Sequence, residues 1–234
     1  PTHNNLTLNL TNNRKSRANS LILSFNSPVI ERLVATLEIT SLDMDDFQEG
    51  SVECFVDCLY TGDIEKMDKG TFREVNKMAK VFDVAWLTGR CFGFFKDLVD
   101  GMSGSYEDML YLFQEASYVC ITLKERGMIN LTLAKIGSDT GCKTLFLRKF
   151  LEDITDVSTS QLDLVVELAG RDLGIVVQSL TGKLKTHLAE QGAVMSDIFR
   201  HFLDTTDLRI CRTLNHKAAF DELFDVLEGC SVDD

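Results

Sequence analysis

The stretch Asp57-Cys-Leu-Tyr-Thr-Gly62 closes an apolar helical run and decides how this chain folds. Before it, apolar residues recur at the three- and four-residue spacing of one helix face, at Val52, Phe55, Val56 and Leu59. Gly62 follows the last of them, and glycine commonly ends a helix because it adopts the left-handed conformation without a steric penalty. The pattern predicts a helix that begins at Phe47 and stops at Tyr60-Thr61-Gly62.

The segment before this helix predicts short strands mixed with short helices. Leu6–Leu10 alternates apolar and polar residues, as a half-buried strand does, and Ser16–Ala18 is expected to return beside it after an Asn-rich turn. An apolar helix is predicted from Ser20, and Ser27-Pro28 predicts the N-cap and first residue of a second helix. The β-branched stretch Thr36–Leu42 is predicted to be a strand.

Helices are predicted throughout the rest of the chain. Thr71 and Glu74 have the spacing of a capping box and open one helix, and a second is expected from Trp86 to Leu98. Residues 101–105 (Gly-Met-Ser-Gly-Ser) read as a linker. Beyond it no alternating stretch remains, and helical runs are predicted around Leu110–Val119, Leu123–Ile136, Cys142–Leu151, Gln161–Leu168, Leu173–Leu188, Val194–Leu203 and Ala218–Leu227.

These elements predict the α+β fold class with two domains. A small sheet flanked by helices is expected over residues 1–100, the linker over 101–105, and an all-α domain over 106–234. Both parts have the size of ordinary domains.

Charge argues against two classes of partner. With 24 Lys and Arg against 36 Asp and Glu, the formal net charge is −12. Nucleic acids and anionic membrane surfaces need a basic face, so we expect neither as a partner. No apolar run is long enough to cross a bilayer.

The reactive residue types do not form a recognisable catalytic pattern. The 7 Cys include no Cys-x-x-Cys pair, and no cluster of His supports a metal site. Scattered free Cys are typical of a reducing, intracellular compartment. Asp43, Asp45 and Asp46 are interpreted as the charged N-terminus of the following helix. We therefore expect no catalytic residue, no metal and no cofactor, and a chain that binds protein partners.

Three blocks of sequence, in order, resemble the BTB (POZ) family. Ala18-Asn-Ser-Leu-Ile-Leu-Ser-Phe-Asn-Ser27-Pro28 resembles its Ala-His-Lys-x-Val-Leu-x-x-x-Ser-Pro pattern. Phe55-Val-Asp-Cys-Leu-Tyr60-Thr61-Gly62 resembles its Phe-x-x-x-Leu-x-Tyr-Thr-Gly. Met78-Ala79-Lys-Val-Phe-Asp-Val84-Ala-Trp-Leu87-x-x-x-Cys91 resembles its Ala-x-x-Tyr-x-Val-x-x-Leu-x-x-x-Cys. The helical second half resembles, by position and helical content, the BACK region of kelch-like adaptors.

The resemblance implies a protein-interaction module. BTB-BACK proteins are commonly substrate adaptors of cullin-3 ubiquitin ligases, and others are transcription regulators or scaffolds that associate with like or unlike BTB domains. It implies an intracellular protein, cytoplasmic or nuclear or both, and a homodimer or BTB heterodimer at full length. The positions implied for a cullin-facing surface are Val34, Leu37, Glu38 and Tyr60.

Two departures from the family pattern keep a cullin-independent scaffold or transcription regulator open as the alternative. The family often places charged residues in a pocket at the dimer interface, where this chain has Asn5, Asn19 and Ser20. Cullin-binding members often carry an apolar-x-Glu triplet, whereas Glu38 is preceded two positions earlier by Thr36. Leu37 and Tyr60 are equally compatible with ordinary core positions.

Overall fold

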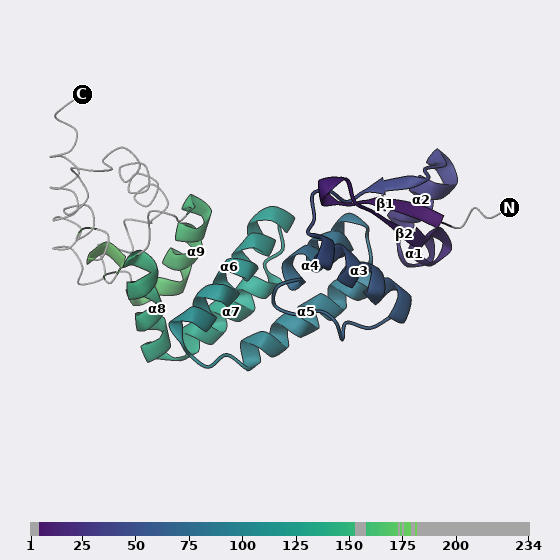
Figure 1. Ribbon diagram of the computed structural model, residues 1–234. Helices are drawn as coiled ribbons and strands as arrows, with labels where there is room; N and C mark the ends of the chain where they lie inside the picture. Colours follow the sequence, from purple (N-terminus) through teal and green to yellow (C-terminus); the bar gives the residue numbers. More distant parts are fainter. Residues whose placement is uncertain (1–4, 153–157, 173, 175, 179–180, 182–234) are drawn as a thin grey trace, which may run out of the picture. The chain divides into compact units, whose positions relative to one another are not determined.

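The computed structural model describes residues 5–152, 158–172, 174, 176–178 and 181 (Figure 1). In chain order its elements are β1 (Asn5–Asn9), η1 (Thr11–Asn13), β2 (Lys15–Asn19), α1 (Ser20–Asn26), α2 (Pro28–Leu37), β3 (Ser41–Asp43), α3 (Glu49–Thr61), α4 (Phe72–Val81), α5 (Ala85–Asp100), α6 (Tyr106–Leu123), α7 (Gly127–Ser138), α8 (Thr140–Glu152), α9 (Thr159–Ala169) and η3 (Gly170–Asp172). The helices predicted over 194–203 and 218–227, and most of the one over 173–188, lie outside the described residues.

The chain divides into two compact units, residues 1–97 and 98–234. The first holds the sheet and its helices, and the described part of the second is helical, which confirms the α+β fold class. Residues 101–105, the expected linker, lie between α5 and α6.

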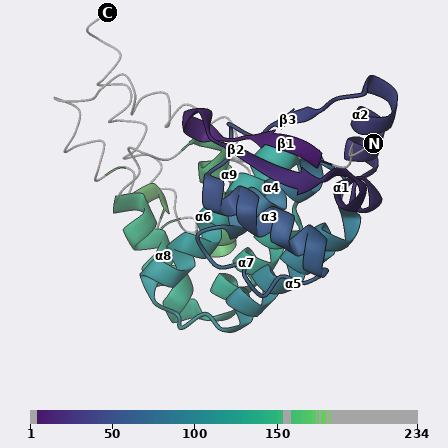
Figure 2. The same cartoon turned by 45° about the vertical axis from the view of Figure 1, so that its right-hand side comes forward.

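The sheet of the first unit has the order β2-β1-β3. β1 pairs antiparallel with β2 and parallel with β3. The turn between β1 and β2 contains Asn12 and Asn13, both with a positive φ near 60°, which Asn tolerates better than most residues. The side chains on the inner face of β1 are apolar and buried. Helices α3 and α4 lie below the sheet in the view of Figure 2.

Helices α1 and α2 pack against each other, and each begins at a local cap. The Asn19 side chain accepts a hydrogen bond from the backbone N–H of Leu21, and the Ser27 hydroxyl oxygen accepts one from that of Ile30. Pro28 takes the first position of α2, where its missing N–H costs nothing. The sequence prediction of this pair of helices is confirmed.

Helix α3 ends as the Tyr-Thr-Gly stretch predicts. Gly62 has φ 72° and donates its backbone N–H to the Cys58 carbonyl at 2.9 Å. The Thr61 hydroxyl donates to the Asp57 carbonyl at 2.8 Å, so the last carbonyls of the helix have partners. On its inner face the Phe55 ring packs 5.8 Å from that of Phe82.

The strand predicted over Thr36–Leu42 is wrong for all but its last two residues. Helix α2 continues through Leu37, and Glu38 ends it in the left-handed conformation with φ 49°. Only Ser41–Asp43 pairs with β1. Of the predicted strand, α2 takes up Thr36 and Leu37, because local strand propensity is weak and the context of the folded chain overrides it.

Three further local predictions are wrong. The next helix begins at Glu49 rather than Phe47, and Asp43 ends β3, so the three Asp do not form a helix N-terminus. The Thr71 hydroxyl makes no capping bond in α4. Glu74 instead accepts a hydrogen bond from the backbone N–H of Gln48 at 2.8 Å and so connects α4 to the start of α3.

The second unit has its own aromatic core. Helix α6 packs against α7 and α8, and the rings of Phe113, Phe146 and Phe150 lie 5.2 to 5.3 Å apart. The predicted runs Cys142–Leu151 and Gln161–Leu168 fall within α8 and α9. Buried aromatic clusters of this kind supply much of the hydrophobic stabilisation of a helical domain.

Candidate functional site

The start of α1 brings together residues that the sequence assigned to two different surfaces. The backbone N–H of Asn19 donates to the Tyr60 hydroxyl at 2.6 Å, across 41 positions of sequence. Asn19 pairs with Asn5 in the β1–β2 register, and Ser20, which follows it, is 6% exposed. The expected dimer-pocket residues Asn5, Asn19 and Ser20 therefore lie together, and Tyr60 of the expected cullin-facing surface contacts one of them.

The other three cullin-facing positions lie at the C-terminal end of α2. Leu37 is 63% exposed, Glu38 is exposed next to it, and Val34 is half-buried one turn earlier. Tyr60 is 45% exposed on α3. The alternative that Leu37 and Tyr60 are ordinary core residues is wrong, since both present apolar surface to solvent.

Helix α1 carries an exposed apolar face that the sequence analysis missed. Leu21 and Phe25 lie one helical turn apart and are 61% and 93% exposed. On the same helix, Leu23 is 1% exposed. The signal was the uninterrupted apolar run Leu21-Ile-Leu23, because one side of a short helix can bury only part of it.

A polar network holds α1 in place beneath this face. The Asn26 side-chain amide donates to the carbonyls of Ile22 and Leu59, at 2.9 and 3.2 Å. Its oxygen accepts from the indole N–H of Trp86 at 3.1 Å. Because these bonds connect α1 to α3 and α5, Leu21 and Phe25 are presented from a helix fixed at two points.

Comparison with known protein families identifies this arrangement. The sequence model of the BTB/POZ domain matches residues 2–98. Residues 2–98 are a BTB/POZ domain. No curated protein matched the chain. The mixed three-stranded sheet and the helices around it are the fold of this domain, and BTB domains are modules that bind other proteins and associate with one another.

The buried thiols of the BTB domain are poorly suited to chemistry. Burial raises the pKa of Cys58 and of Cys91 to about 12, and it also raises the pKa of Cys54. A thiol that keeps its proton is a weak nucleophile and a weak metal ligand. Among the described residues, no group of three or more His, Cys, Asp or Glu could hold a metal ion.

None of the helices in the described part of the chain has the length and apolar character needed to cross a membrane.

Proposed function

We propose that this chain is an intracellular adaptor whose BTB domain binds cullin-3, so that the protein presents substrates to a cullin-3 ubiquitin ligase. The cullin-facing surface consists of Val34, Leu37, Glu38 and Tyr60. In this proposal residues 106–234 are a BACK-like helical extension. The observation that carries the proposal is the exposure of Leu37, at 63%, together with that of Tyr60, at 45%.

The chemistry of this surface suits a protein partner. Exposed aromatic and aliphatic side chains are the usual anchors of protein interfaces, where each fills a pocket of the partner. Glu38 adds a carboxylate directly after Leu37, and its left-handed backbone turns the chain at that point. Leu37 and Glu38 thus place an apolar and an acidic group side by side, although Thr36 stands where the family's apolar-x-Glu triplet has its apolar residue.

Calorimetric titration of the purified chain with the cullin-3 N-terminal domain tests the proposal. We expect saturable binding that weakens by at least about tenfold in Leu37→Asp, because a charge at a central anchor typically costs about 2 kcal/mol or more. Val81→Asp is the matched control, since Val81 is also an exposed aliphatic residue, at 51%, in the same unit. No binding at tens of micromolar would reject the proposal.

A second candidate is a cullin-independent scaffold or transcription regulator that acts by homotypic or heterotypic BTB association. Phe25, at 93% exposed, and Leu21, at 61%, favour it, because a large exposed apolar pair on one helix face commonly marks an association surface. Ser20 begins the same helix, Asn19 caps it, and Asn5 pairs with Asn19 in the sheet, and all three are uncharged. This surface would form a homodimer or a BTB heterodimer.

The two candidates separate in a paired experiment. Light scattering of Phe25→Asp is expected to show loss of self-association, while Leu37→Asp retains it. Wild-type chain that self-associates but neither binds the cullin domain nor retrieves ubiquitin-ligase activity in a pulldown supports the scaffold. Cullin binding that survives in Phe25→Asp supports the adaptor.

A further inference from the structure

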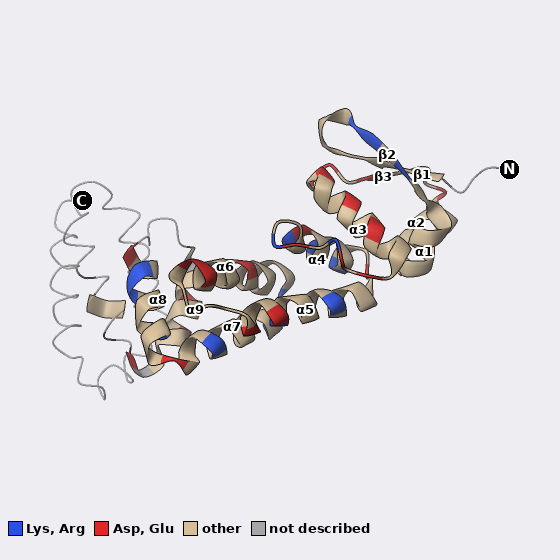
Figure 3. Ribbon diagram, turned by 60° about the horizontal axis from the view of Figure 1, so that its bottom comes forward, with Lys and Arg blue, Asp and Glu red and all other residues tan. Residues whose placement is uncertain are grey.

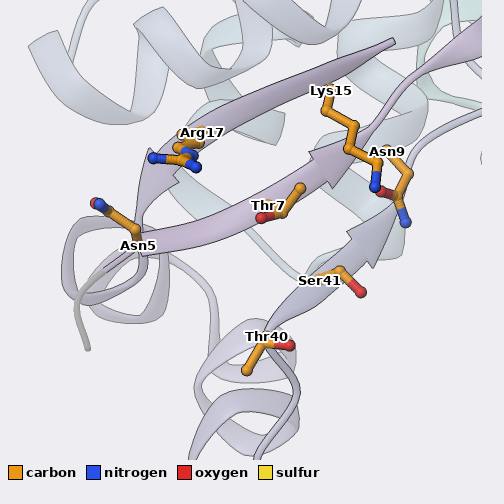
Figure 4. Close-up of a pocket in the computed structure, with 7 residues that line it drawn as sticks. All are labelled: Asn5, Thr7, Asn9, Lys15, Arg17, Thr40 and Ser41. Carbon is orange, nitrogen blue, oxygen red and sulfur yellow. The ribbon is translucent and has the colours of Figure 1, made fainter. Parts of the chain in front are cut away.

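We draw no further inference here: the strongest candidate, the open polar hollow of about 620 Å³ on the outer face of the sheet (Figure 4), carries none, because Lys15 and Arg17 of β2 share that face with the acidic Asp43 of β3 (Figure 3) and nothing in the structure selects an occupant for it.

Discussion

The inner and outer faces of the sheet differ in burial and in polarity. Leu6, Leu8 and Leu10 point inward and are 1 to 4% exposed, whereas Asn5, Thr7 and Asn9 alternate with them on the other face and are exposed or half-buried. Both faces belong to the same hydrogen-bonded strands, so backbone pairing cannot explain why only one of them is buried. Burial against the helices decides which residues of the sheet hold the fold together.

Helix α1 repeats this contrast within one helix. Leu23 is buried, and Leu21 and Phe25 on the other side are exposed although they are just as apolar. Apolar character alone therefore does not distinguish a core residue from an interface residue. Matched substitutions at buried and at exposed positions test how strongly burial separates residues that stabilise the fold from residues that do not.

The largest effect is expected for a cavity on the inner face of the sheet. Leu8→Ala should lower the free energy of unfolding by about 3 kcal/mol, because it removes buried methyl groups and leaves a void. Thr7→Ala, its neighbour on the outer face, should change it by less than about 0.5 kcal/mol. Urea unfolding followed by the fluorescence of Trp86, the single tryptophan, measures both. Similar losses in the two variants would break the distinction between the faces.

A smaller loss is expected for a buried hydroxyl. Ser27 is fully buried, caps α2 through the N–H of Ile30 and donates to the Phe82 carbonyl. Ser27→Ala should cost about 2 kcal/mol, because it removes the cap and leaves a buried carbonyl without its donor. Ser41→Ala on the outer sheet face is the control and should be nearly neutral. The same urea titration compares them, and a neutral Ser27→Ala would contradict the expected role.

Replacing either of two asparagines by leucine is expected to change the free energy of unfolding, but in opposite directions. Both polar atoms of the fully buried Asn76 side chain lack a hydrogen-bond partner among the described residues. Asn76→Leu should therefore raise the free energy of unfolding by about 1 kcal/mol, because it removes an uncompensated desolvation cost. Asn26→Leu should lower it by a similar amount, since Asn26 makes the bonds to α3 and Trp86. Thermal unfolding of both variants checks the signs, and destabilisation by Asn76→Leu would show that its amide is satisfied.

The smallest effect near neutral pH is expected from the buried thiols. In the folded chain the pKa of Cys58 and of Cys91 is raised to about 12 by burial, from an ordinary value of 9.0. Above pH 9 the unfolded chain releases protons that the folded chain retains, so the unfolded state becomes favoured. Stability from these groups is complete below pH 9 and is lost progressively between pH 9 and pH 12.

Urea midpoints from pH 7 to pH 10.5 measure this dependence. The double variant Cys58→Ala/Cys91→Ala should show a flatter decline than the wild-type chain over the same range. Parallel declines would assign the pH dependence to other groups.

Much of the BTB domain follows from the sequence alone, because its signals are local. The alternation of Leu6–Leu10, the cap at Ser27-Pro28 and the stop at Gly62 each depend on neighbours within a turn or a strand repeat, and the structure has them as predicted. The three motif blocks likewise indicated the BTB family, whose sequence model matches residues 2–98.

Tertiary structure alone decided where α2 ends, what Glu74 bonds and which surfaces stay open. Glu74 reaches Gln48, and Tyr60 reaches Asn19 across 41 positions, so neither bond has a signature within a sequence window. The exposure of Leu21 and Phe25 depends on what packs beside them. Local sequence sets the period of each element, but burial and pairing belong to the whole fold, and they determine which residues remain to bind a partner.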